Sequence, residues 1–66
     1  MKNTIKVQRA IKGLTQEELA QKISVSRQTI NAMEANKYVP STVLALKLAK
    51  LFNQPVEELF ILEKGD

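Results

Sequence analysis

Two helix-start signals in close succession constrain this 66-residue chain more than any other feature. Thr15 is followed three residues later by Glu18, which predicts a capping box whose hydroxyl and carboxylate satisfy amide hydrogens left free at a helix start. Ser26 is the next cap, and only the residues Ile23-Ser24-Val25 lie between the two helices. Apolar residues stand at both pairs of hydrophobic-staple positions: Leu14, Leu19, Val25 and Ile30. The stretch 15–37 therefore predicts two short helices joined by a tight turn.

The two faces of the second helix differ in chemistry. Ile30 and Met33 share one face at helical spacing, which indicates positions in a core. The other face carries Arg27, Gln28 and Asn31. Arg can bond guanine O6 and N7 together, and Gln or Asn can bond adenine N6 and N7, so these side chains suit base reading in a major groove. Polar residues also cover any solvated helix face, and that alternative stays open for this helix taken alone.

A further polar residue, Gln16, stands in the first turn of the preceding helix, where its amide can reach a DNA phosphate. With it, the run LTQEELAQKISVSRQTINAMEANKYVPS resembles the Cro/repressor-type helix-turn-helix family, also called the XRE family. The resemblance extends over nearly the whole chain. It implies an all-α fold, a compact five-helix bundle of the lambda-repressor-like DNA-binding type, and a recognition helix at about 27–35.

The resemblance also implies roles for particular residues. Arg27, Gln28 and Asn31 are expected to read bases, and Thr29 is a weaker candidate. The residues expected to contact the phosphate backbone are Gln16, Ser26, Asn36, Lys37 and Tyr38. Arg9 and Glu34 occupy positions that form an internal ion pair in many family members. Glu34 lies on the core side of its helix, where an unpaired carboxylate is costly, so we prefer this pair to a solvated Arg9.

Composition narrows the possible functions. The chain is long enough for one small domain, residues 1–66, and 44% of it is hydrophobic and 26% charged, which is typical of a soluble globule. It contains no Cys and no His, and its two Gly do not form a phosphate-binding run, so we expect no enzyme activity, metal or cofactor. The net charge of +3 favours a polyanion only weakly. No apolar run is long enough for a secretory signal or a membrane span, so a cytoplasmic location is expected.

The remaining helices are predicted from caps and breakers. The first helix is expected from about Asn3 to Lys12, before Gly13, with Gln8 either half-exposed at its edge or on a rotated helix. The second is expected at about Gln16–Ile23. Ser41 caps a helix at about Thr42–Phe52, and Pro55 starts the last, Val56 to about Phe60. The chain ends resemble those of small family members in which they pair as a short two-stranded ribbon.

The helix at 42–52 has apolar residues on more than one stripe, and three more apolar residues come at 60–62. This is more apolar surface than one core-facing side requires, although a bundle this small can use all of it internally. We expect a homodimer, as is usual in the family. The candidate interface residues are Leu44, Leu51, Phe60, Ile61 and Leu62.

The function expected from the sequence is sequence-specific transcription regulation. The chain is predicted to be a repressor that binds a near-palindromic operator in double-stranded DNA as a homodimer, with no small-molecule ligand and no membrane partner. The alternative is an antitoxin-type module that neutralises a partner protein and also binds its own promoter. A stable homodimer with operator affinity of its own would favour the first hypothesis.

Overall fold

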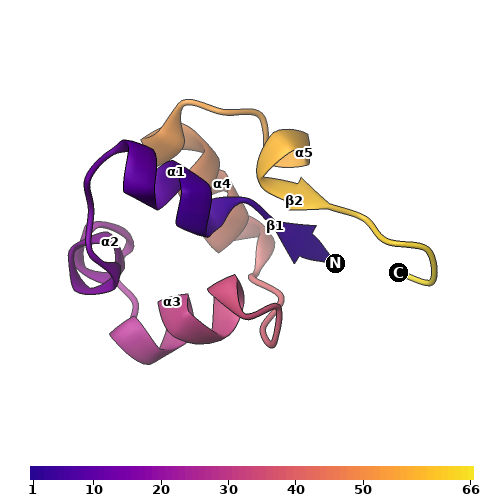
Figure 1. Ribbon diagram of the computed structural model, residues 1–66, viewed down its shortest axis with the longest axis horizontal. Coiled ribbons are helices and arrows are strands. Elements are labelled where there is room, and N and C mark those ends of the chain that lie inside the picture. Colours follow the sequence, from indigo (N-terminus) through magenta and orange to yellow (C-terminus); the bar gives the residue numbers. More distant parts are fainter.

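The computed structural model describes residues 1–66 and contains five helices and a two-stranded ribbon (Figure 1). In chain order the elements are β1 (Lys2–Asn3), α1 (Ile5–Ile11), α2 (Gln16–Ile23), α3 (Arg27–Glu34), α4 (Thr42–Phe52), α5 (Val56–Leu59) and β2 (Phe60–Ile61). The predicted helical fold with a terminal ribbon is therefore confirmed. None of the helices is long and apolar enough to cross a bilayer.

The start of α2 forms the capping box that the sequence predicts. The Thr15 hydroxyl accepts a 3.0 Å bond from the backbone N–H of Glu18, and the Glu18 carboxylate accepts a 2.9 Å bond from the backbone N–H of Thr15. Hydrogen bonding to the Glu18 carboxylate from the Thr15 backbone N–H, and then from the Thr15 side chain, lowers the pKa of Glu18. At the other end of α2, Ser24 adopts a left-handed conformation with φ of 61°, which turns the chain into Ser26 and α3.

The core joins all five helices and is entirely apolar. Each of the eleven buried residues is hydrophobic, and no buried side-chain nitrogen or oxygen lacks a hydrogen-bond partner. The core residues are Ile5, Leu19, Ala20, Ile23, Ile30, Met33, Leu44, Leu48, Phe52, Leu59 and Phe60. Burial of one large aliphatic side chain stabilises a fold by about 1.5–3 kcal/mol, so Ile30 and Met33 fix α3 firmly against α2 and the core.

The helices at both ends of the chain are shorter than predicted. α1 begins at Ile5 rather than Asn3, and α5 ends at Leu59 rather than Phe60, because the residues beyond these ends pair as strands. Pro55 is the N-cap of α5 and not its first helical residue. α3 ends at Glu34, one residue earlier than expected. In α1, Gln8 is half-buried, in agreement with the first alternative for this residue.

The ribbon brings the two ends of the chain together on one side of the molecule (Figure 1). β1 and β2 are antiparallel, with Lys2 opposite Ile61 and Asn3 opposite Phe60. The α-amino group of Met1 forms ion pairs with Glu63 and Asp66, each at 3.0 Å. A 2.7 Å bond from the backbone N–H of Glu63 and the pairing with Met1 lower the pKa of Asp66. The C-terminal tail therefore packs back against the start of the chain.

Candidate nucleic-acid interface

α3 lies along one edge of the bundle, with one side against the core and the other open (Figure 1). Ser26 caps the helix, because its hydroxyl accepts a 3.2 Å bond from the backbone N–H of Thr29. Ile30 and Met33 are fully buried, whereas Arg27, Gln28 and Asn31 are exposed. A helix of this length with one apolar side and one polar side can enter a major groove while the core holds it in place.

Four of the predicted contact residues lie together. Gln16 at the start of α2 and three residues of α3, Arg27, Gln28 and Asn31, line an open hollow of about 230 Å³. No hydrophobic residue contributes to its lining. We call this set of four residues the polar hollow. It combines a guanidinium group with three carboxamides, and all four groups can bond to base edges or phosphates.

The Gln16 side chain donates hydrogen bonds to two other side chains of the protein. Its Nε2 donates to Glu34 Oε1 at 3.1 Å and to Asn31 Oδ1 at 3.4 Å. A side-chain bond from this amide to a phosphate therefore requires one of these bonds to open. The contact with Gln16 also turns the oxygen of Asn31 inward, which leaves the Asn31 NH₂ group free to donate to an acceptor outside the protein.

Glu34 and Arg9 form an ion pair between α3 and α1. Arg9 Nε lies 2.7 Å from Glu34 Oε2, and Arg9 Nη2 lies 3.3 Å from Glu34 Oε1. Arg9 Nη1 donates in addition to the backbone carbonyl of Leu14 at 2.9 Å. One guanidinium group thus binds α3 and the loop before α2 at once, behind the polar hollow.

Ser26 and Thr29 bond to each other. Their hydroxyl oxygens are 3.0 Å apart, and the Ser26 hydroxyl also caps α3. Thr29 is half-buried. Both hydroxyls are thus occupied at the start of the helix, and a contact from either to DNA competes with these bonds.

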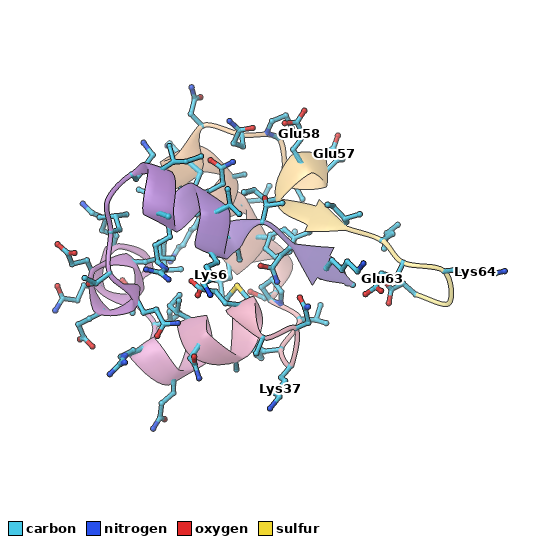
Figure 2. All side chains as sticks on the ribbon, in the orientation of Figure 1. Lys6, Lys37, Glu57, Glu58, Glu63 and Lys64 are labelled. Atoms are coloured by element: carbon cyan, nitrogen blue, oxygen red, sulfur yellow. The ribbon has the colours of Figure 1, made fainter.

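The loop after α3 presents the remaining predicted contacts. Asn36 adopts a left-handed conformation with φ of 61°, and the backbone N–H of Lys37 donates to the Ala32 carbonyl at 2.8 Å. Asn36, Lys37 and Tyr38 are all exposed. The Lys37 side chain points away from the bundle next to the end of α3 (Figure 2). The loop therefore lies beside the open face of the helix.

Lys6 is a basic residue near this face that the sequence analysis did not single out. It lines a second polar hollow, of about 350 Å³, with Arg9, Gln16, Asn31 and others. In Figure 2 it lies between α1 and α3. The available signal is its spacing from Arg9, because residues three apart on a helix are neighbours on one side.

Acidic side chains gather at the other end of the molecule. Four of the seven acidic residues, Glu57, Glu58, Glu63 and Asp66, follow Pro55 in the sequence. Figure 2 shows Glu57 and Glu58 on α5, on the side away from α3. Lys6 and Lys37 lie near α3. Lys64 also lies in the C-terminal tail, and Glu17 and Glu18 stand beside Gln16 in the first turn of α2, so charge alone does not single out the α3 side.

The structure revises the candidate dimer residues. Leu44 and Phe60 are only 7% and 8% exposed, so they belong to the core and have little surface left for a partner. Leu51 is half-buried, whereas Ile61 and Leu62 are 46% and 78% exposed. Of the five candidates, Leu51, Ile61 and Leu62 therefore keep the surface that a partner could cover, and the dimer interface stays a prediction.

Exposed apolar side chains near the ribbon form a continuous surface. One hollow of about 240 Å³ is lined by residues that include Val39 and Leu46, and another of about 380 Å³ by residues that include Ile61 and Leu62. The two hollows share the residues Met1, Val56 and Phe60. We call Val39, Leu46, Ile61 and Leu62 the apolar face.

The amino-acid sequence of this fold matches a known protein family. A helix-turn-helix family model matches residues 5–59, from the first residue of α1 to the last residue of α5. The chain belongs to this helix-turn-helix family. The resemblance to XRE-type proteins that the sequence shows is therefore confirmed.

Relatives of this helix-turn-helix chain are similar to it over almost their full lengths. A protein of Methanocaldococcus jannaschii described as an uncharacterized HTH-type transcriptional regulator is 56% identical over 66 residues, which is 100% of both chains. The protein YgzD of Bacillus subtilis, with the same description, is 47% identical over 64 residues, 97% of each chain. A third, from Archaeoglobus fulgidus, is 49% identical over 63 residues, 96% of this chain and 90% of the relative.

Proposed function

We propose that this protein is a sequence-specific transcriptional repressor that binds a near-palindromic operator as a homodimer. The family and the descriptions of its relatives indicate a DNA-binding regulator and not an enzyme. The repressor role, the symmetric operator and the dimer are our proposal. In it, α3 enters the major groove and the Asn36–Tyr38 loop contacts the backbone.

The observation that carries the proposal is the polar hollow. Arg27, Gln28 and Asn31 come from one face of α3, and Gln16 reaches them from the start of α2. The Arg9–Glu34 pair behind the hollow holds α3 to α1, so the reading side chains project from a fixed backbone. A fixed reading helix loses little conformational freedom when DNA binds, which strengthens binding.

The apolar face supports the dimer. A single copy of α3 reads only a half-site, and two copies related by a two-fold axis read half-sites about 34 Å apart. Leu46 is 56% exposed, and Leu62 is 78% exposed. A second copy that covers these side chains would bury apolar surface and set the separation between the two reading helices.

The polar hollow can be tested by truncating its exposed residues. We expect Arg27→Ala and Gln28→Ala each to relax preference at particular base pairs by roughly 1–3 kcal/mol. Affinity is measured by fluorescence anisotropy on an operator duplex and on duplexes with single base-pair changes. Lys50→Ala is the matched control, because Lys50 is exposed in the last turn of α4 and not in the polar hollow.

The outcomes separate the proposal from its alternative. Unchanged affinity and base preference in both variants would show that another surface reads DNA. A wild-type protein that stays monomeric and binds DNA only with a second protein would support the antitoxin-type alternative instead.

A further inference from the structure

Asn3 lies in β1, but its side chain contacts the end of α3. Its Nδ2 donates to the Met33 backbone carbonyl at 2.7 Å and to Asn36 Oδ1 at 3.1 Å. Its Oδ1 accepts a 3.2 Å bond from the backbone N–H of Ile5. One carboxamide therefore joins the start of α1, the last turn of α3 and the loop that follows.

The two groups that Asn3 contacts on the α3 side decide where the loop goes. The Met33 carbonyl belongs to the last turn of α3, where it accepts a 3.0 Å bond from the backbone N–H of Asn36 as well as the bond from Asn3. Asn36 has a positive φ, and the chain changes direction there before Lys37. The bonds from Asn3 to these two groups hold the end of α3 and the turn at Asn36. They therefore also set the position of the Lys37 backbone.

β1 is itself held by the C-terminal part of the chain. Asn3 pairs with Phe60 in the ribbon, and the backbone N–H of Thr4 donates to the Leu59 carbonyl at 2.9 Å. The Thr4 hydroxyl donates to the Glu58 carbonyl at 3.0 Å. The ribbon adjoins the apolar face through Ile61. Asn3 is thus the side chain through which the ribbon touches the loop after α3.

We propose that Asn3 is a positioning residue for DNA binding, which holds the 36–38 loop against the ribbon so that Lys37 is presented in its binding position before DNA arrives. The inference rests on the proposed function, in which Lys37 contacts a phosphate. Pre-ordering a loop lowers the entropy that binding costs, so the Lys37 contact is strong only while Asn3 is in place. The same link connects the loop to the surface proposed to set the dimer spacing.

A double-mutant cycle in DNA affinity tests this coupling. Asn3→Ala, Lys37→Ala and the double variant are compared with wild type on one operator duplex at fixed salt. If Asn3 positions Lys37, the losses of DNA affinity in the two single variants are not additive. Once Asn3→Ala has released the loop, removal of the Lys37 side chain lowers the affinity by a smaller factor. We expect the double variant to bind more tightly than the product of the single losses predicts, by more than the roughly twofold scatter of independent sites.

Thr4→Val is the matched control, because it removes the bond from the residue next to Asn3 to the Glu58 carbonyl of α5 without touching the loop. The loss of DNA affinity in Thr4→Val is expected to be additive with the loss in Lys37→Ala. Asn3→Ser keeps an acceptor for the Ile5 N–H but lacks the Nδ2 group that donates to Met33 and Asn36, so it should behave like Asn3→Ala. The backbone NMR order parameters of residues 36–38 should fall in both Asn3 variants and stay unchanged in Thr4→Val.

If Asn3→Ala does not fold, Asn3→Ser takes its place in the cycle, because Ser keeps an acceptor for the Ile5 N–H at the start of α1. Additive losses for Asn3 and Lys37, with unchanged order parameters in the loop, would overturn the proposal. A Lys37→Ala variant with normal affinity would instead refute the phosphate contact in the proposed function, and this inference with it.

Discussion

The guanidinium group of Arg9 contacts both carboxylate oxygens of Glu34, at 2.7 Å and 3.3 Å, and so connects α1 to α3. The Glu34 side chain is 6% exposed and that of Arg9 is 17% exposed. Gln16 adds a 3.1 Å bond to the same carboxylate. The network lies directly behind the polar hollow, so the groups that stabilise the fold also set the position of the groups proposed to read DNA.

Truncation of either partner in this pair should destabilise the fold. We expect Glu34→Ala and Arg9→Ala each to lower the free energy of unfolding by about 2–3 kcal/mol, because each leaves a partly buried charge unpaired. The double variant should lose less than the sum of the two. Urea unfolding followed by circular dichroism measures these losses, with Glu17→Ala, an exposed change on α2, as the control. Strictly additive losses would mean that the pair adds no stability of its own.

The capping box should make part of the stability pH-dependent. The pKa of Glu18 is lowered in the folded protein, so its charge stabilises the fold above the ordinary glutamate pKa. That contribution is lost as the pH falls through the lowered value. Glu18→Gln keeps a capping acceptor without the charge, so it should be less stable than wild type at pH 7, with the difference shrinking in acid.

Denaturant midpoints at several pH values measure this difference. Glu57→Gln is the control, because Glu57 is exposed and its side chain has no hydrogen bond within the protein. A Glu18→Gln deficit that stays constant down to low pH would show that the charge of Glu18 contributes nothing and that only its shape matters.

Lys37 should contribute to affinity without contributing to base preference. A phosphate contact releases bound counterions, so Lys37→Ala is expected to weaken binding to all sequences alike. The slope of log affinity against log salt should decrease by about 1 per half-site. Titrations of operator and unrelated duplexes at several salt concentrations measure both effects. Loss of affinity for the operator alone would instead place Lys37 among the base readers.

The apolar face should carry the dimer. We expect the Ile61→Gln, Leu62→Gln double variant to shift the protein toward monomers and to weaken operator binding, while isolated half-sites are bound as before. Ile11→Gln is the matched control, because Ile11 is 71% exposed on α1, outside the apolar face. Analytical ultracentrifugation reports the mass. A double variant that remains dimeric would move the interface elsewhere.

Local signals in the sequence predict the helices well. Thr15, Ser26 and Ser41 each cap the helix expected of them, because a cap depends on residues only three positions away. Local signals do not predict the bounds of the ribbon strands. β1 and β2 are two residues each, too short for any periodicity, and their pairing depends on chain ends that the sequence separates widely. The sequence therefore predicts a helix at Asn3, where the structure has a strand.

The same contrast between local signals and long-range contacts holds for the candidate site. Helical spacing is enough to place Arg27, Gln28 and Asn31 on one exposed face. It does not reveal that the Gln16 amide turns toward Glu34, that Lys6 lies near Asn31, or that Asn3 contacts Met33, since each depends on how separate elements pack. Predictions from one helix thus succeed for the exposure of these three residues and miss the groups that pack behind them.

Selection of bound duplexes from a random pool of double-stranded DNA tests most directly the claim that the exposed face of α3 reads an operator. The account predicts a two-fold symmetric consensus, with half-sites about one helical turn apart, for the wild-type protein. It also predicts that Arg27→Ala and Gln28→Ala lose the preferred base at different positions of each half-site. A pool without enrichment, or a consensus unchanged by both substitutions, would contradict it.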